Sequence, residues 1–218
     1  ESEYREVHQK AVVLYRKQAR FQLITTGKIS QKQLLFEDQH LERLTKASRY
    51  FAYPFDPENL RQKIEKECQA CDRNQDYRLR ISLSKSGEIE LSRQVLTSLS
   101  PKFCQAKLCL QEADLQQAFT YFKTTHRPHL TLGKQEIIYH NAAGELLETS
   151  IGNLVLKIDG KLYTPPINLD ILPGIYRQHL LETGQVEEKV LTVLDLNHAE
   201  AIYGCNAVRG LYELTLES

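Results

Sequence analysis

The stretch of residues 141–174, NAAGELLETSIGNLVLKIDGKLYTPPINLDILPG, constrains the fold of this chain more than any other. Turn-forming residues punctuate it, and apolar runs of strand length lie between the turns. In order, it predicts a hairpin turn, a strand that carries an isolated acid, a second hairpin, and a tight turn that leads into a helix. The second half of the chain is therefore expected to be a sheet with at least one packed helix.

The rest of this half follows the same pattern. Its expected strands are 136–140, 146–149, 154–158 and 161–163. A helix is expected at 175–183, and Gly184 ends it as a C′ glycine. The apolar segments 190–193 and 211–216 close the chain.

The first half predicts a smaller unit that mixes helices and strands. Its expected elements are a strand at 21–26 paired with 28–35, a helix at 40–50, a second helix from Pro57, and a hairpin of 78–83 with 88–91. Asp56 is expected to cap the second helix, with Pro57 in its first turn. Ser86-Gly87 forms the turn of the hairpin. Residues 2–19 have helical spacing and predict an N-terminal helix.

These elements divide the chain into four parts. They are an N-terminal helix at 1–20, a small α/β domain at 21–97, a linker containing Ser and Pro at 98–103, and a larger domain at 104–218. The expected fold class is α/β (α+β), and the larger domain carries a mixed sheet.

The composition narrows the class of function. The chain has 218 residues, 41% of them hydrophobic, which is enough to bury one sizeable core or two small ones. Lys+Arg and Asp+Glu both number 28, so the net charge is zero and no general binding to nucleic acid or to a membrane surface is expected. No apolar run approaches the roughly 20 residues that span a bilayer. With no signal peptide at the start either, a cytoplasmic location is expected.

The five cysteines do not form a framework of disulfides typical of secreted proteins. Cys68 and Cys71 form a CxxC without a second such pair nearby, and two incidental cysteines on a helix explain it better than zinc or redox chemistry. No metal site is expected. The chain starts at Glu1 and contains no Met, which indicates a fragment of a longer protein or a sequence that lacks some residues.

Four segments occur in an order that resembles a known family. They are HLERL, FKTTHR, the stretch 141–174 and CNAVRG. In this order they resemble the class IV (fold type IV) pyridoxal phosphate enzymes, most closely the aminodeoxychorismate lyases. The resemblance covers roughly residues 21–218. It implies a small N-terminal domain, a larger barrel-like domain at 104–218 that binds the cofactor, and pyridoxal 5′-phosphate as that cofactor.

Lys123 is the candidate for the catalytic amine. It follows an apolar and aromatic run, where partial desolvation lowers the pKa of an amine and frees its nucleophile. Taken alone, such a lysine is more often a solvated strand end. The resemblance implies that Lys123 binds C4′ of the cofactor and then moves protons on the substrate. It also implies supporting roles for His126 and Arg127, with Arg127 as a candidate substrate contact.

Glu148 is the candidate acid for the pyridine nitrogen. It lies in an otherwise apolar and hydroxylic strand, and a carboxylate buried there needs a cationic partner, which a protonated pyridine would be. The resemblance pairs it with Asn153, five positions later. Glu145 is the solvent-facing alternative if the register differs.

A helix N-terminus and a second loop are the candidates for the phosphate site. The Leu-Pro-Gly turn before residue 175 exposes the backbone N–H groups of Ile175 and Tyr176. Tyr176 stands where the family usually has Thr, so the backbone contacts are expected and the hydroxyl contact is not. The resemblance makes the Asn206 side chain and the Ala207 amide further donors.

Arg43, in HLERL, matches the arginine that reaches the phosphate from the small domain of this family. Without the resemblance, it reads as an exposed helix charge with an i,i+3 neighbour. Thr25 or Thr26 matches the threonine that lines the ring or substrate, and Arg209 is a candidate for binding a substrate carboxylate bidentately.

The resemblance implies a lyase that acts on a small molecule, 4-amino-4-deoxychorismate, and eliminates pyruvate to give p-aminobenzoate for folate synthesis. The loop Asn206-Ala207-Val208-Arg209-Gly210 favours the lyases over the aminotransferases of the class. The alternatives are a class IV aminotransferase, for branched-chain or D-amino acids, and an inactive class IV module that acts as a scaffold or dimerisation domain.

The resemblance also implies a homodimer. The pattern SEYREVHQKAVVL resembles the last helix of chorismate-binding synthase subunits, which predicts fusion to or association with such a subunit. Two spacings are shorter than the family pattern, namely Thr26 to Gly27-Lys28 and Lys123 to Asn141. They predict either missing loops or a trimmed domain.

Overall fold

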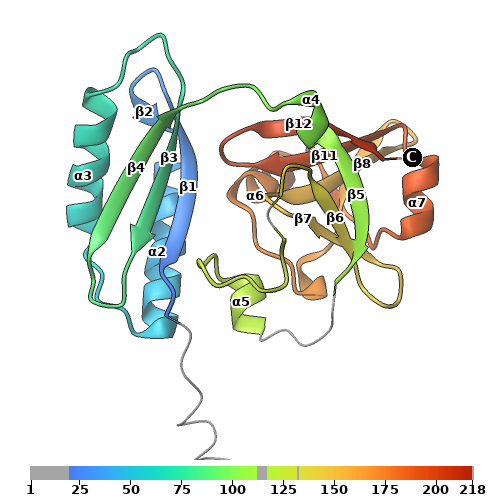
Figure 1. Cartoon of the computed structure of the whole chain (residues 1–218), viewed down its shortest axis with the longest axis horizontal. Coiled ribbons are helices and arrows are strands. Elements are labelled where there is room, and N and C mark those ends of the chain that lie inside the picture. Colours follow the sequence, from blue (N-terminus) through green and yellow to red (C-terminus); the bar gives the residue numbers. More distant parts are fainter. Residues whose placement is uncertain (1–19, 112–116, 132, 218) are drawn as a thin grey trace, which may run out of the picture.

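The computed structural model of the protein describes residues 20–111, 117–131 and 133–217. Two sheets dominate it, and each has its own buried core (Figure 1). The helix predicted at 1–20 falls outside the described residues except for Arg20.

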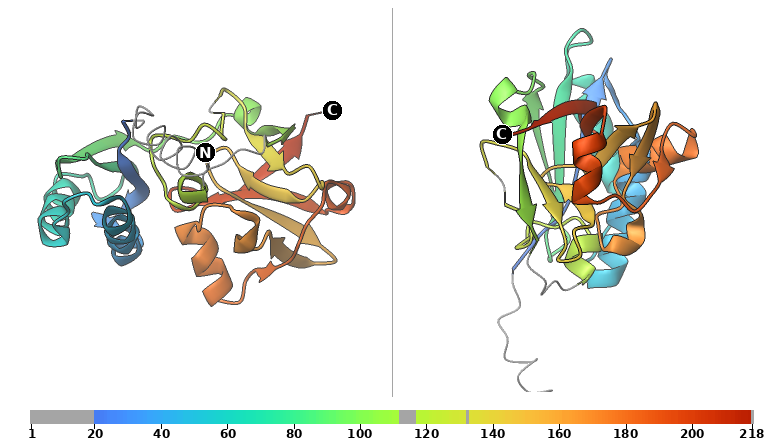
Figure 2. Two further views of the ribbon diagram at one scale, coloured as in Figure 1. Left: turned by 90° about the horizontal axis from the view of Figure 1, so that it is seen from below. Right: turned by 90° about the vertical axis from the view of Figure 1, so that its right-hand side faces the viewer.

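The first sheet has four strands in the order β2-β1-β3-β4. They are β1 (Leu23–Ser30), β2 (Gln33–Leu34), β3 (Tyr77–Leu83) and β4 (Ile89–Val95), all antiparallel to their neighbours. Helices α2 (Glu37–Phe51) and α3 (Pro57–Gln69) lie side by side on one face of this sheet (Figure 2, left). The hydrophobic residues of that face form the core of this part.

The start of this sheet differs from the prediction. The strand does not end at Thr26 but continues through Gly27 to Ser30, and the hairpin turns at Gln31-Lys32. Both of these residues have positive φ, 50° and 66°, as a two-residue type I′ turn requires. This position within the strand requires glycine, because a Cβ there would lie 2.5 Å from Nε2 of buried His40.

The second helix and the second hairpin are as predicted. The Asp56 side chain accepts hydrogen bonds from the N–H groups of Glu58 and Asn59, and Pro57 is the first residue of α3. The hairpin of β3 and β4 turns at Gly87, with φ of 87°. Cys68 and Cys71, at the end of α3, are buried free thiols.

The second sheet contains a closed barrel. Its strands are β5 (Gln105–Leu110), β6 (Ile137–His140), β7 (Leu146–Thr149), β8 (Asn153–Ile158), β9 (Lys161–Thr164), β10 (Glu187–Glu188), β11 (Ala201–Asn206) and β12 (Gly210–Leu216). Pairing of β7 with β8 closes the six strands β8-β11-β12-β5-β6-β7 (Figure 2, right). The predicted α/β class with a barrel-like mixed sheet is confirmed.

Short helices connect the strands of the barrel. They are α4 (Pro101–Cys104), α5 (Gln117–Tyr121), the 3-10 helix η1 (Ile167–Leu169), α6 (Ile175–Glu182) and α7 (Val193–His198). α6 ends before Gly184, whose φ of 66° fits the predicted C′ position. The strands from β6 to β9 also follow the prediction, whereas β5, β11 and α7 were not predicted. Among the described residues, no helix is long and apolar enough to cross a bilayer.

Candidate active site

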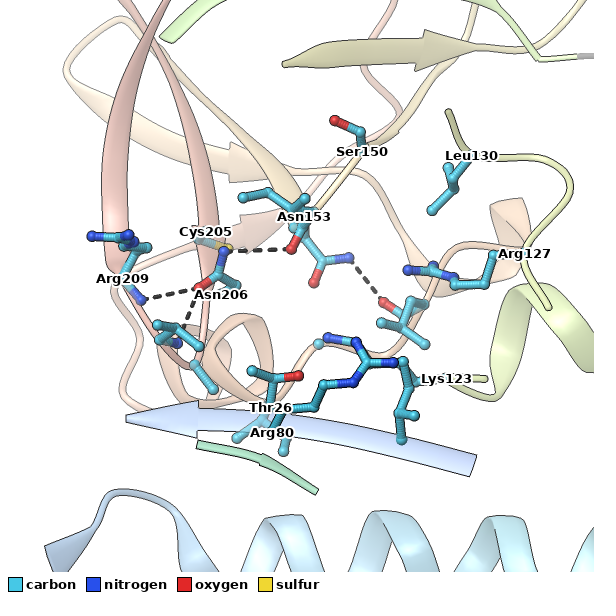
Figure 3. A pocket seen from close by; sticks show the side chains of 18 of the residues that line it. Thr26, Arg80, Lys123, Arg127, Leu130, Ser150, Asn153, Cys205, Asn206 and Arg209 are labelled. Carbon is cyan, nitrogen blue, oxygen red and sulfur yellow. Dashed lines mark hydrogen bonds between the residues drawn. The ribbon is translucent and has the colours of Figure 1, made fainter. Parts of the chain in front are cut away.

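A cavity of about 540 Å³ lies between the two sheets. Strands β1 and β3 line one side of it, and the other side is formed by the barrel, the start of α6 and the loop after β11 (Figure 3). This volume is typical of small-molecule sites, which range over about 300–1,000 Å³.

Lys123 lines the cavity on a segment that is tied to β1. Its carbonyl accepts a hydrogen bond from the Ile24 N–H at 2.9 Å, and the Thr125 N–H donates to the Gln22 carbonyl at 2.9 Å. Phe122, the residue before it, packs edge-on against Phe51 of α2, with ring centroids 5.4 Å apart. These contacts hold the backbone of Lys123 in place at the cavity wall.

The Lys123 amine lies in a cationic and desolvated environment. Burial, followed by the guanidinium groups of Arg43, Arg127 and Arg78, holds the pKa of Lys123 well below its usual value, and Glu148 acts in the opposite direction. A lowered pKa leaves more of the amine unprotonated at neutral pH, which a nucleophile and proton carrier needs.

Glu148 lies in β7 and is almost fully buried, with 2% exposure, so the predicted register is the observed one. Burial raises the pKa of its carboxyl, while Arg127 and a backbone hydrogen bond from Leu172 act against that rise. Arg127 Nη2 is 3.5 Å from Glu148 Oε1, and Nε2 of buried His129 is 4.0 Å from the same oxygen. Arg127 lines the cavity, as a substrate contact would, but it also partners the acid.

Asn153 shapes the turn that leads into α6. Its Nδ2 donates to the Leu172 carbonyl at 2.8 Å, and its Oδ1 faces Gly174 so closely that a Cβ at Gly174 would lie 1.8 Å from it. Only glycine fits there. No side chain caps the start of α6, so the backbone N–H groups of its first turn, including those of Ile175 and Tyr176, have no side-chain acceptor among the described residues.

Arg43 reaches this turn from the other sheet. Its Nη2 donates to the Pro173 carbonyl at 2.6 Å, and burial followed by Arg127 lowers the pKa of its guanidinium to about 10. It is therefore a cavity-lining cation next to the helix N-terminus, unlike an ordinary exposed helix charge.

The second predicted loop differs in one detail. Asn206 Oδ1 accepts from the N–H groups of Val208 and Arg209, both at 3.0 Å, and its Nδ2 donates to the Ile151 carbonyl at 3.4 Å. The Asn206 side chain thus organises the loop itself, and Ala207 also lines the cavity.

The structure separates the two threonine candidates. Thr26 lines the cavity, whereas the Thr25 hydroxyl lies 2.6 Å from Nδ1 of buried His40 on the opposite face of β1. Alternation along the strand requires this difference. Arg209 lines the cavity, and its Nη1 also donates to the Thr97 carbonyl.

Tyr176 contributes no side chain to the cavity lining. Its ring packs edge-on against Phe36, with centroids 6.0 Å apart, and its hydroxyl lies close to Gly210. The hydroxyl is therefore directed away from the cavity, while the backbone N–H of Tyr176 lies in the first turn of α6.

Three residues of the site were not predicted: Arg78, Arg80 and His129. Arg78 and Arg80 alternate with buried Leu79 and Ile81 in β3, a period-2 pattern that could have marked them as one face of the strand. His129 has no such signal in the sequence, because only the tertiary fold brings it to Glu148.

The described lining of the cavity contains cations and no Asp or Glu. Its cations are Arg43, Arg78, Arg80, Lys123, Arg127 and Arg209. Among the described residues, no group of acids, histidines or cysteines has the arrangement of a metal site. An amine, a buried acid and a cationic helix N-terminus together fit pyridoxal phosphate, which presents an aldehyde carbon, a ring nitrogen and a phosphate.

Known proteins resemble this chain in sequence and in fold. The sequence model for "Amino-transferase class IV" matches residues 22–215. A Thermotoga maritima protein named "Probable branched-chain-amino-acid aminotransferase" is 32% identical over 92 residues, which are 37% of this chain and 34% of that protein. The chain thus spans about a third of the length of this curated relative.

Two solved structures share the fold over most of the chain. A "Putative amino-acid aminotransferase" from Mesorhizobium loti has a TM-score of 0.78 and 28% identity, covering 90% of this chain and all of that one. A "putative 4-amino-4-deoxychorismate lyase" from Haemophilus somnus has a TM-score of 0.71 and 24% identity, covering 89% of this chain and all of that one. The family match confirms the predicted resemblance and, with it, pyridoxal 5′-phosphate as the cofactor.

Proposed function

The chain belongs to amino-transferase class IV, and on this premise we propose that it is a pyridoxal phosphate-dependent 4-amino-4-deoxychorismate lyase. The observation that carries the proposal is the cavity that contains the Lys123 amine and is lined by five arginines and no acid in its described part. 4-Amino-4-deoxychorismate is an amine with two carboxylates, and such a cavity favours it over amino acids with apolar side chains. The loop Asn206-Ala207-Val208-Arg209-Gly210 supports the same activity.

The residues that would hold the cofactor come from both sheets. Lys123 is the amine for its aldehyde carbon, and Glu148 is the anion for its ring nitrogen. The backbone N–H groups of Ile175, Tyr176 and Ala207, together with the Arg43 guanidinium, would hold the phosphate. In this proposal Asn153 and Asn206 act on the phosphate site through the turns that they shape.

The bound cofactor supplies an electron sink for the negative charge that develops at the amine-bearing carbon of the substrate. Lys123 Nζ takes the proton from that carbon, and such a positioned base contributes on the order of 10²–10⁴-fold to the rate. Glu148 would be the anion for the ring nitrogen, and Arg127 favours its ionised form against the effect of burial. Thr26 and Arg209 orient the substrate, which loses its enolpyruvyl side chain as pyruvate and becomes aromatic.

A class IV aminotransferase is the second candidate. The 28% identity to the Mesorhizobium loti structure and the 32% identity to the Thermotoga maritima segment favour it. Both activities use the same cofactor residues, so the substrate distinguishes them. A homodimer, a link to a chorismate-binding synthase and a cytoplasmic location belong to the lyase proposal and rest on the family resemblance.

The test is p-aminobenzoate formation from 4-amino-4-deoxychorismate with added pyridoxal phosphate. Wild type and Lys161→Ala, which changes an exposed lysine of β9, are expected to form product, and Lys123→Ala is expected to form none. A parallel assay with an amino acid and a 2-oxo acid tests transamination. Transamination without p-aminobenzoate from the wild type would overturn the lyase proposal in favour of the aminotransferase.

A further inference from the structure

Two arginines of β3 face the cavity from the small sheet. Arg78 and Arg80 occupy alternate positions of the strand and line the cavity, whereas Leu79 and Ile81 between and beside them are buried against α2 and α3. In the sheet register, Arg80 lies opposite Thr26 of β1, which also lines the cavity (Figure 3). The strand therefore presents two guanidinium groups to the same space as Lys123.

Neither arginine is neutralised by an acid of the described residues. Within the described part of the chain, Arg78 and Arg80 form no ion pair with a carboxylate, and the lining contains no acid. Two acids lie near this face of the sheet. Asp76 pairs with Lys28, the residue of β1 opposite Arg78, and Glu90 of β4, opposite Ser82, forms no ion pair among the described residues. The positive charge that faces the cavity is thus left for a ligand.

The neighbours of Arg78 add to this charge. Burial, then Arg80, then Arg209 lower the pKa of the Arg78 guanidinium, so the three cations act on one another. Arg209 comes from the barrel loop after β11 and donates a hydrogen bond to the Thr97 carbonyl, which places cations on both sides of the cavity. Like charges held together and partly desolvated are unfavourable until an anion binds between them.

The phosphate of the cofactor does not explain these arginines. In the proposed function the phosphate is held by the N-terminus of α6 and by Arg43, which reaches this turn from α2 and donates to the Pro173 carbonyl. Arg78 and Arg80 lie on another element, β3, and could therefore bind a second anionic group. Planar guanidinium groups are well suited to a carboxylate, which they bind bidentately.

We propose that Arg78 and Arg80 form a subsite for a substrate carboxylate remote from the reacting amine, so that this site selects dianionic amines over amino acids with one carboxylate and an apolar side chain. The inference rests on the proposed function in that it uses the same cavity and cofactor. For 4-amino-4-deoxychorismate, the carboxylate concerned is the one on the ring opposite the amine, which the product retains.

The experiment compares two ligands of nearly the same shape, p-aminobenzoate, which carries a carboxylate, and p-aminobenzamide, which carries a neutral amide in its place. Their dissociation constants are measured by calorimetry with the cofactor-loaded protein for wild type, Arg78→Gln/Arg80→Gln and Arg49→Gln, a control at the exposed end of α2. Wild type and the control are expected to bind the acid at least tenfold more tightly than the amide. The double variant is expected to lose this preference while its affinity for the amide changes by less than about threefold.

An unchanged preference in the double variant would overturn the subsite, as would equal binding of both ligands by the wild type. Arg78→Lys/Arg80→Lys, which keeps the charges, is expected to restore part of the preference, and a thermal melt of each variant confirms that it folds. The result is independent of turnover. A charge preference that depends on Arg78 and Arg80, in a wild type that makes no p-aminobenzoate, would support the subsite and refute the lyase.

Discussion

Two acids buried in the same barrel, Glu136 and Glu148, have different surroundings. Glu136, just before β6, accepts hydrogen bonds from the Ser150 and Tyr212 hydroxyls, the latter at 3.0 Å, and from backbone groups of Ile137 and Ile151. Glu148 has a backbone donor in Leu172, and its side-chain neighbours are basic groups, with Arg127 at 3.5 Å and His129, whose pKa burial lowers to about 4, at 4.0 Å. Burial is the main cause of a raised carboxyl pKa at both positions.

In the proposed function, this difference separates a structural acid from one that pairs with a ligand. Neutral donors satisfy both oxygens of Glu136, and Tyr212 fits there because Gly204 and Gly152 leave room for its ring and hydroxyl. Glu148 lies beside a residue that lines the cavity, and the long contact to Arg127 leaves its carboxylate able to accept another cation. Burial alone does not distinguish the two acids, but the kind of partner does.

The largest expected effect comes from neutralising Glu148. Glu148→Gln keeps the shape but removes the negative charge that the proposed function assigns to the ring nitrogen, and the kcat/KM of p-aminobenzoate formation is expected to fall on the order of 10²–10³-fold. Glu145→Gln, at the part-exposed acid of the same hairpin, is the control and is expected to retain activity. Equal activity of Glu148→Gln and wild type would contradict the assigned role.

Glu136→Gln is expected to have the opposite profile. The amide group faces one hydroxyl with the wrong polarity, so the free energy of unfolding is expected to fall by about 1–3 kcal/mol. The kcat/KM at a permissive temperature is expected to stay within about threefold of wild type. Urea denaturation measures the first quantity and steady-state kinetics the second. A loss of activity without a loss of stability would place Glu136 in the chemistry and remove the contrast with Glu148.

His40 is a buried base, and its hydrogen-bond partner, the Thr25 hydroxyl, is neutral. Burial, with Arg43 and Lys123, lowers the pKa of His40 from 6.5 to about 3. The unfolded chain therefore binds more protons as the pH falls below 6.5, so the contribution of neutral His40 is complete above that pH and is lost as the pH drops toward 3. Between pH 7 and 5, the stability is expected to fall by about 1–2 kcal/mol from this group. Thermal melts of His40→Gln at both pH values should show a smaller fall than wild type, and an equal fall would contradict the assignment.

Arg127→Gln is expected to have the smallest effect at neutral pH. Arg127 lowers the pKa of Glu148, so its removal raises that pKa and the ionised carboxylate is lost at a higher pH. The acid limb of the pH–rate profile should move to higher pH, with a loss of less than about tenfold at pH 7.5. Arg73→Gln, at an exposed loop arginine, serves as the control. A limb that does not move would mean that Glu148 does not control it.

Elements with a strong local signal were predictable. The hairpins and strands between residues 136 and 164, the cap at Asp56 and the end of α6 before Gly184 all follow from turn and capping chemistry within a few residues. The error at β1 shows the limit. Gly27 looks like a turn residue, but it lies inside a strand. Glycine is needed there because His40, thirteen positions away, packs against it.

The sequence by itself determined most of the local elements and marked Lys123, Glu148, Asn153 and Arg43 as candidate site residues, because each lies in a recognisable local pattern. Only the tertiary structure decided which side chains share one space. It pairs Arg127 with Glu148, turns Thr26 toward the cavity and Thr25 away, closes β7 onto β8 and brings Arg78 and Arg80 to face Lys123. These relations join residues that are far apart in the chain, and they depend on strand register and on the packing of two sheets, which no local pattern specifies.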